Sequence, residues 1–283
     1  MIERLAIVGV GLLGGSVAKA VRARGAAREI VGVGRDLARL RPAVSDGAVD
    51  GVTTDLAEGV AGADLVVLGA TVLANDALLP AVWAAVPAGA CITDVGSTKR
   101  SIVREAERLT AERGDVHFVG SHPMAGGEKS GYGVARADLF ERATVVVTPT
   151  KHRVDSAVDR VTTLWRTLGA RVVVWDAEVH DRSVAAISHL PHVVAWALMD
   201  AVHRYEPAAL DIVAGGFKDT TRIAASDPAV WREILLANRD EVAVSLGAFR
   251  EALADLERLI AVADPAALES YLARVKTLRE AVR

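Results

Sequence analysis

The sequence predicts an α/β protein, in which a Rossmann-type, doubly wound sheet is followed by an all-helical C-terminal domain. Three observations predict it. A glycine-rich loop follows the first apolar run, short apolar runs alternate with helical stretches as far as residue 174, and only helical patterns follow Trp175. A chain of 283 residues is long enough for two domains. We place the sheet domain at residues 1–176 and the helical domain at residues 177–283.

Composition excludes several classes of protein. Hydrophobic residues make up 51% of the chain, so a large core is expected. The formal net charge of −3, from 33 basic and 36 acidic residues, gives no basis for a nucleic-acid or anionic-membrane partner. The single cysteine, Cys91, cannot form an intramolecular disulfide, and no apolar run approaches the length of a membrane span. Without a signal peptide pattern, a cytoplasmic location is expected.

The first strand is expected at residues 5–8, and a G-x-G-x-x-G motif follows it directly. Gly9 permits a tight turn, Gly11 lets a pyrophosphate approach the backbone, and Gly14 lets the next helix pack close to the strand. The helix runs to about Arg24, and its first N–H groups and positive dipole end favour phosphates. The predicted cofactor-binding residues in this loop are Gly9, Gly11, Leu12, Leu13 and Gly14.

The second strand, at residues 30–33, bears on which dinucleotide binds. Proteins that bind NAD usually carry an acidic residue near its end, which holds the ribose 2′-hydroxyl. This chain has Gly34 and then Arg35, which suits the 2′-phosphate of NADP. NAD stays the alternative, because Asp36 is close enough to take the acidic role and Arg35 could be ordinary surface charge.

The same alternation of strands and helices continues to residue 174. Apolar runs predict strands at residues 51–53, 64–69, 91–94, 116–120, 144–147 and 171–174. Helical patterns predict helices at residues 74–86, 98–113 and 155–168. The sheet is therefore expected to have about eight strands.

Two loops at the carboxyl ends of strands carry candidate catalytic side chains. His122 is expected in a glycine-lined loop, residues 121–131, where a neutral imidazole is suited to accept a proton. Glu128, six residues further on, is a candidate ligand-binding carboxylate in the same loop. Ser97 is expected to hydrogen-bond a substrate hydroxyl or His122, to cap the helix at 98–113, or to do both.

The helical domain begins with a stretch at residues 176–199 in which Pro191 should cause a kink. His189 and His192 share a face of this helix, but no third ligand completes a metal set, so no metal is expected. Further on, Gly215 and Gly216 precede Lys218 and Arg222, and this pattern is typical of an anion site or of an ordinary solvated helix start.

The last helices carry apolar stripes that need a partner. Asp227 and Pro228 are typical of an N-cap and a first helical position. Apolar side chains then recur every three or four residues at positions 246, 249, 253, 256 and 260, and again at 268, 272, 275 and 278. We expect a homodimer to bury these stripes, and an internal core is the alternative.

Five motifs together resemble the prephenate/arogenate dehydrogenase family of tyrosine biosynthesis, in the family's order and over nearly the whole chain. They span residues 9–14, 94–99, 120–126, 188–192 and 216–222. The resemblance implies a Rossmann-type domain followed by a helical dimerisation domain. It implies prephenate or arogenate as substrate, oxidised by NADP or NAD with loss of CO2.

The resemblance also implies roles for single residues. His122 would engage the ring hydroxyl of the substrate, and Ser97 would assist it by a hydrogen bond. His192 and Arg222 would contact the substrate, and His189, Lys218 and Glu128 are further candidates for substrate binding. Gly34 and Arg35 depart from the pattern of NAD-preferring members, which have an acidic residue there.

Two other functions stay open on the sequence alone. A β-hydroxyacid dehydrogenase has a similar organisation, but its acid–base lysine has no counterpart here, since no lysine occurs between Lys151 and Lys218. The other is a dinucleotide-sensing protein without turnover, which nucleotide binding with no product from any cyclohexadienyl substrate would favour.

Overall fold

The structure is a computed structural model of the chain, and it describes residues 1–127 and 129–282. Eight strands form one sheet in the order β3-β2-β1-β4-β5-β6-β7-β8. They are β1 (Ile2–Val8), β2 (Ala27–Val33), β3 (Gly51–Thr53), β4 (Leu65–Leu68), β5 (Cys91–Asp94), β6 (His117–Pro123), β7 (Thr144–Pro149) and β8 (Arg171–Val174). The predicted α/β class and the count of eight strands are confirmed.

One strand pair departs from the parallel pattern. β7 runs antiparallel to β6, whereas every other neighbouring pair is parallel. The start of β7 therefore lies beside the end of β6, with His122 opposite Val146. The carboxyl ends of β1, β4, β5 and β6 meet at one edge of the sheet, and this is the edge where ligands bind in open α/β folds.

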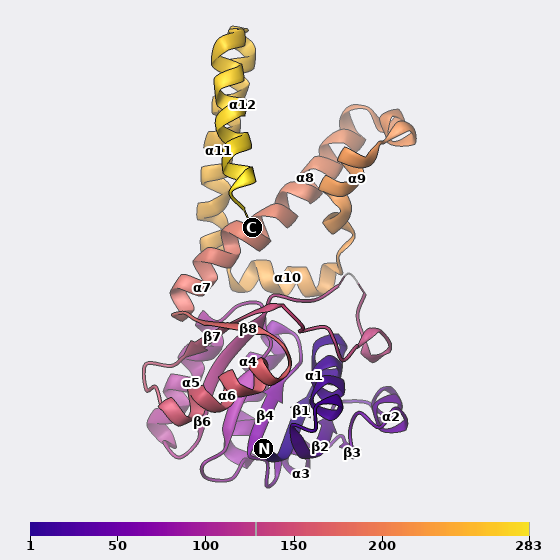
Figure 1. Cartoon of the computed structure of the whole chain (residues 1–283), viewed down its shortest axis with the longest axis vertical. Coiled ribbons are helices and arrows are strands. Elements are labelled where there is room, and N and C mark those ends of the chain that lie inside the picture. Colours follow the sequence, from indigo (N-terminus) through magenta and orange to yellow (C-terminus); the bar gives the residue numbers. More distant parts are fainter. Residues whose placement is uncertain (128, 283) are drawn as a thin grey trace. The chain divides into compact units, whose positions relative to one another are not determined.

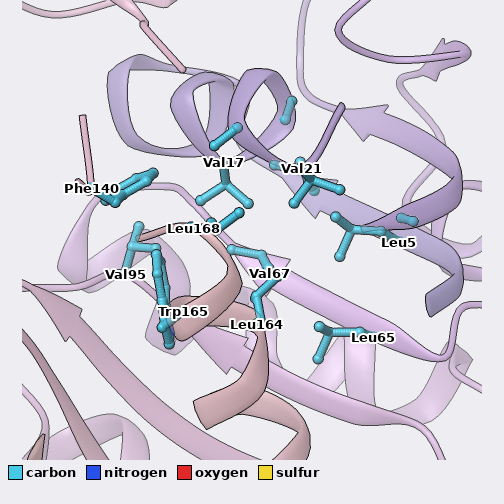
Figure 2. Close-up of a cluster of buried hydrophobic side chains, with 14 of the residues drawn as sticks. Leu5, Val17, Val21, Leu65, Val67, Val95, Phe140, Leu164, Trp165 and Leu168 are labelled. Atoms are coloured by element: carbon cyan, nitrogen blue, oxygen red, sulfur yellow. The ribbon is translucent and has the colours of Figure 1, made fainter. Parts of the chain in front are cut away.

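Helices cover both faces of the sheet (Figure 1). Those that follow the strands of the sheet are α1 (Leu12–Ala23), α2 (Leu37–Ser45), α3 (Leu56–Val60), α4 (Val72–Ala85), α5 (Arg100–Glu112) and α6 (Asp155–Thr167), with a 3₁₀ turn, η1, at Tyr132–Val134. Side chains of α1 and α6 share one buried cluster with Leu5 and Leu65 (Figure 2). Side chains of α3, α4 and α5 share another with Ala6 and Val66. Neighbouring residues of one strand enter different clusters because strand side chains alternate between faces, and this explains the nearly continuous apolar runs.

The helical part begins with a stretch that is interrupted near its middle. It consists of α7 (Ala177–Val184), a π-helical turn, η2 (Ala185–His189), and α8 (Leu190–Tyr205). Pro191 lies in the first turn of α8, directly after the π turn. Because proline has no N–H and its ring crowds the carbonyl four residues earlier, the wider turn accommodates it. The kink predicted at Pro191 therefore takes the form of this π turn.

This stretch also corrects an expectation about membrane spans. Residues Ala177–Tyr205 form a helical segment of 29 residues that is long and apolar enough to cross a membrane by length and composition alone. The segment nevertheless places His180, Asp181 and His189 in a buried polar network with the sheet edge, described below. A helix that supplies buried polar groups to the interior of a protein can have the same length and composition as a membrane span. We therefore interpret residues Ala177–Tyr205 as part of the candidate active site.

The remaining elements, two 3₁₀ turns and four helices, follow α8. They are η3 (Pro207–Ile212), α9 (Gly215–Thr221), η4 (Arg222–Ala225), α10 (Pro228–Ala237), α11 (Arg239–Val262) and α12 (Pro265–Glu280). Asp227 caps α10 by accepting hydrogen bonds from the N–H groups of Ala229 and Val230, as predicted. Helix α10 ends at Ala237 with Asn238 as its C-cap, and the first apolar stripe lies on the separate helix α11.

By compactness the chain divides into residues Met1–Asn238 and Arg239–Arg283. Helices α7 to α10 thus belong to the same compact unit as the sheet. The boundary predicted at residue 176 marks a different feature, the change from strands to helices. In the second unit, α11 and α12 bury none of their described residues.

Candidate active site

The glycine loop after β1 has the backbone shape that a dinucleotide needs. Gly9 has a φ of +98°, and a Cβ there would lie 2.7 Å from the backbone N of Ala70. A Cβ on Gly14 would lie 2.0 Å from the carbonyl O of Gly9, so only glycine lets α1 start this close to the strand. At Gly11 a Cβ would meet nothing within 4 Å, and none of the described side chains caps α1. The first N–H groups of α1 therefore face open space, which suits a bound phosphate.

The end of β2 carries Gly34, Arg35 and Asp36. Asp36 caps α2, because its carboxylate accepts a hydrogen bond of 2.8 Å from the N–H of Ala38. A second oxygen of Asp36 lies 3.6 Å from Arg39. Asp36 is therefore already engaged by its own helix. Arg35 is exposed at the end of this strand.

His122 lies within β6 and not in the loop where the sequence placed it. The strand extends three residues further than predicted, to Pro123, because β7 pairs with it along residues 119–123. Only 8% of the His122 surface is exposed. Burial, together with nearby His180, Lys99 and His189, holds the pKa of His122 well below its usual range. The imidazole is thus neutral at pH 7.

His122 belongs to a chain of three buried side chains. Its Nδ1 lies 2.9 Å from Nε2 of His180, and Nδ1 of His180 lies 2.7 Å from Oδ1 of Asp181. His180 and Asp181 are 0% and 1% exposed. Burial lowers the pKa of His180, although Asp181 opposes the shift. Burial alone would raise the pKa of Asp181, but hydrogen bonds from His180 and from the backbone N–H groups of Arg100 and Lys99 lower it overall.

Lys99 and Asp94 form a buried ion pair next to this chain. Lys99 Nζ also donates to the carbonyl O of Ser121 over 2.9 Å, and Asp94 Oδ1 accepts from the N–H of Ser121 over 3.0 Å. The pair therefore fixes the backbone of the residue before His122. Lys99 is 0% exposed and Asp94 compensates its charge, so it is not a cation that an incoming ligand could pair with.

Two of the predicted roles of Ser97, the cap of α5 and a hydrogen bond to His122, are not seen in this structure, while a hydrogen bond to a substrate hydroxyl stays a prediction. Helix α5 begins at Arg100, and its first N–H groups are capped by Asp181, which accepts from Lys99 N over 2.8 Å and from Arg100 N over 3.0 Å. Ser97 is therefore not the N-cap. Among the described residues its hydroxyl has no hydrogen-bond partner, and His122 Nδ1 is engaged by His180 instead. A long-range contact from α7 replaced the local cap, and nothing in the local sequence around Ser97 indicated it.

The two histidines of the long helical stretch separate into different environments. His189 is 1% exposed, and its Nδ1 accepts from Nδ2 of Asn238 over 3.2 Å. Its Nε2 is buried without a partner among the described residues. Burial lowers the pKa of His189 to about 4. His192 is half-buried and stacks on Trp231, with ring centroids 3.6 Å apart.

The predicted anion site lies on α9 and η4. Lys218 and Arg222 are both exposed in the chain as described. Arg222 lies close enough to His192 to lower the pKa of that imidazole, an effect smaller than that of burial. Glu128, the remaining predicted residue, lies outside the described residues. In the described ranges no group of three or more His, Cys, Asp or Glu side chains could hold a metal ion.

Sequence reasoning missed four polar residues of this site: His180, Asp181, Asn238 and the Asp94 of the ion pair. Asn238 joins two parts of the network, since it donates to the carbonyl O of Asp181 over 2.8 Å and accepts from Arg100 over 3.0 Å. A His-Asp pair one turn into a helix was a visible signal, because side chains of this kind are seldom buried without a reason. Asn238 gave no such signal.

Comparison with known proteins identifies the family. Residues 17–174 match the nucleotide-binding domain of prephenate dehydrogenase, and residues 176–274 match its dimerization domain. Prephenate dehydrogenase of Bacillus subtilis (strain 168) is 33% identical over 99% of this chain and 75% of its own. Cyclohexadienyl dehydrogenase of Zymomonas mobilis is 35% identical over 91% of this chain and 87% of its own.

A solved structure supports the same assignment through the fold. Prephenate dehydrogenase from Aquifex aeolicus, crystallised in complex with hydroxyphenyl propionate and NAD+, superposes with a TM-score of 0.92. It is 34% identical, and the match covers 100% of this chain and 99% of the Aquifex chain. The two family models, the relatives that match 91–99% of this chain and this superposition agree: the chain belongs to the prephenate dehydrogenase family.

Proposed function

We propose that this protein oxidises prephenate to 4-hydroxyphenylpyruvate, with loss of CO2 and hydride transfer to a nicotinamide cofactor. The observation that carries the proposal is the neutral, buried His122 at the carboxyl end of β6, held by His180, in a chain that belongs to this family. A base of this kind is what the reaction needs, since the ring hydroxyl must lose its proton as the hydride leaves the same carbon.

The glycine loop supports a nicotinamide dinucleotide as the cofactor. Gly9 and Gly14 close the turn, and Gly11 leaves open space before the uncapped start of α1. Leu12 and Leu13 are the first residues of that helix, so their N–H groups lie where a pyrophosphate would accept hydrogen bonds. When bound, the cofactor supplies the hydride acceptor.

The chain's own residues then perform the remaining tasks. His122 accepts the hydroxyl proton on Nε2, the nitrogen without a partner among the described residues. Release of CO2 makes the ring aromatic and drives the reaction forward, so the protein mainly orients groups and excludes water. The unpartnered Nε2–H of His189 is a buried donor suited to a polar atom of the substrate.

Arg222 is the proposed ligand for a substrate carboxylate, since its guanidinium can form two parallel hydrogen bonds. Lys218 and His192 are proposed to assist, and Glu128 is proposed from its place six residues after His122 in the sequence. Arg222→Ala should raise KM for prephenate roughly 30-fold, with a cofactor Kd within a few-fold of wild type. Arg222→Lys should recover part of the loss. Normal prephenate KM in the alanine variant would remove Arg222 from substrate binding.

For the cofactor we propose a preference for NADP over NAD. Gly34 has no side chain to hold a ribose 2′-hydroxyl, Asp36 is engaged in capping α2, and Arg35 is exposed at the strand end. Arg35→Ala should then raise the KM for NADP roughly 10- to 100-fold and change the KM for NAD little. Arg39→Ala, one turn further along α2, is the matched control. Equal losses for both cofactors, or a wild-type preference for NAD, would contradict the proposal.

The decisive experiment uses the purified full-length chain, with prephenate and arogenate each combined with NAD and NADP, followed at the nicotinamide absorbance. Turnover of prephenate is expected. Turnover of arogenate alone, or of both substrates, would indicate the arogenate or cyclohexadienyl activity, and the Zymomonas relative makes the latter the second candidate. Cofactor binding with no turnover of either substrate would favour a dinucleotide sensor.

We further propose a cytoplasmic homodimer.

A further inference from the structure

The buried chain His122–His180–Asp181 has a direction that its hydrogen bonds determine. Asp181 is ionised at pH 7, so its Oδ1 can only accept, and Nδ1 of His180 must donate to it. A neutral His180 then has its lone pair on Nε2. The 2.9 Å contact therefore requires Nδ1 of His122 to be the donor, and this leaves the lone pair of His122 on Nε2.

We propose that His180 and Asp181 are positioning residues for the reaction: they fix His122 in the tautomer whose Nε2 accepts the substrate proton. The inference rests on the proposed function, in which His122 is the base. No local sequence feature places these residues together, since His180 and Asp181 come from the start of α7 and His122 from the end of β6.

The hydrogen bonds of the same chain persist in the charged state that His122 reaches during turnover. When the hydroxyl proton moves to Nε2, the imidazolium keeps its Nδ1–H bond to His180, whose own partner is the carboxylate of Asp181. The other groups that face His122 are Lys99, at the start of α5, and His189, in the π turn. Lys99 is compensated by Asp94, so Asp181 is the carboxylate that is linked to His122 through hydrogen bonds.

Asp181→Asn tests the direction of the chain. The carboxylate of Asp181 accepts further hydrogen bonds. Its Oδ1, which accepts from His180, also accepts from Lys99 N, and its Oδ2 accepts from N and Nε of Arg100. An amide NH2 at the Oδ1 position would donate to Nδ1 of His180, so the proton of a neutral His180 would move to its Nε2. Nε2 of His180 would then donate to Nδ1 of His122, and the proton of His122 would lie on Nε2. By analogy with the wrong-tautomer effect at an acid–base histidine, kcat should fall roughly 10²–10⁴-fold with KM within a few-fold.

The matched control is Asp176→Asn. The carboxylate of Asp176 caps the same helix, accepting from Glu178 N over 2.9 Å and from Val179 N. It has no hydrogen bond to the side chain of His180, whose backbone N–H donates to the carbonyl O of Asp176. Asparagine is an equally good cap, so kcat and KM should stay at wild-type values. A similar loss of kcat in both variants would mean that the start of α7 matters only structurally, and would overturn the proposal.

A second pair of variants changes His180 and leaves the caps of α5 and α7 as they are. Among the described residues the side chain of His180 is hydrogen-bonded only to His122 and Asp181. His180→Gln keeps an acceptor oxygen for Nδ1 of His122 and should retain kcat within about tenfold. His180→Leu removes the acceptor and should lose roughly 10²-fold or more. Equal kcat in these two variants would overturn the proposal, and this comparison decides the matter if Asp181→Asn does not fold.

The tautomer itself can be measured without turnover. In protein labelled with ¹⁵N-histidine, long-range ¹H–¹⁵N spectra at pH 7.5 should show His122 protonated on Nδ1, and the His122→Asn spectrum assigns its signals among the seven histidines. Asp181→Asn should shift the proton to Nε2. If the wild type does not oxidise prephenate, the proposed function fails while this result stands. A wild-type tautomer in Asp181→Asn would overturn the positioning role alone.

Discussion

At the scale of single residues, the surroundings of His122 disfavour its protonated form. The ring is buried, and His180, Lys99 and His189 all add to the effect of burial on its pKa. A base must be unprotonated before it can act, so these neighbours keep His122 ready at neutral pH. The buried ion pair of Lys99 with Asp94 adds rigidity, since it grips the backbone of Ser121 directly before His122.

His122→Asn should lower kcat roughly 10²–10⁴-fold with little change in KM, because asparagine keeps a polar side chain but cannot accept the proton as imidazole does. Steady-state kinetics with prephenate measures this. His117→Asn is the control, since His117 begins the same strand and lies outside the buried chain. A kcat near the wild-type value in His122→Asn would remove this residue from the mechanism.

The pH dependence of kcat/KM should reflect the lowered pKa of His122. A histidine whose pKa is depressed stays neutral as pH falls through 6.5, the usual value, and loses activity only when pH reaches the lower folded-state pKa. The acid limb of kcat/KM should therefore have its midpoint below pH 6.5. A midpoint above pH 6.5 would show that the free enzyme carries a histidine stabilised in its charged form.

At the scale of elements, the glycine loop and the π turn each place a group that a regular helix or strand would misplace. Two glycines of the loop differ: at Gly14 a Cβ would collide with the Gly9 carbonyl, so this residue serves packing, whereas at Gly11 a Cβ would meet nothing within 4 Å, which agrees with its proposed role in dinucleotide binding. The π turn accommodates Pro191 and directs His189 toward Asn238, while His192, three residues on, stacks on Trp231.

The two glycines should therefore respond differently to alanine. Gly14→Ala should destabilise the fold by about 1–3 kcal/mol through overpacking, which thermal melting measures. Gly11→Ala should leave the melting temperature unchanged but weaken dinucleotide binding, because the methyl group of the alanine would occupy the space open to the pyrophosphate. Isothermal titration with NADP and NAD measures that loss. The reverse pattern would mean that the loop does not hold the dinucleotide in this way.

At the scale of the whole molecule, the C-terminal unit carries apolar side chains that the single chain does not bury. On α11 and α12, Leu253, Ile260, Leu272 and Leu278 are each more than half exposed. Two helices cannot bury both of their apolar stripes in one another when the stripes are this wide. The match of residues 176–274 to a dimerization domain agrees with a second copy as the partner.

Leu272→Asp should therefore convert a dimer into monomers, since a buried carboxylate at an apolar interface is strongly unfavourable. Light scattering after size-exclusion chromatography measures the mass. Thr277→Asp adds the same charge to the opposite face of α12 and should leave the dimer intact. A wild-type monomer, or a Leu272→Asp variant that stays dimeric, would contradict this interface.

The sequence by itself determined the fold class, the eight strands, the glycine loop and the family, because these depend on periodic apolar patterns and on short motifs whose residues are neighbours in the chain. It also singled out His122 and His189, which the structure buries in one polar network. Tertiary structure alone decided what surrounds them. The antiparallel pairing with β7 placed His122 in a strand, Asp181 replaced Ser97 as the cap of α5, and Asn238 joined His189 to the start of α7. Hydrogen bonds between residues that are far apart in the sequence follow from packing, so a local sequence pattern does not indicate them.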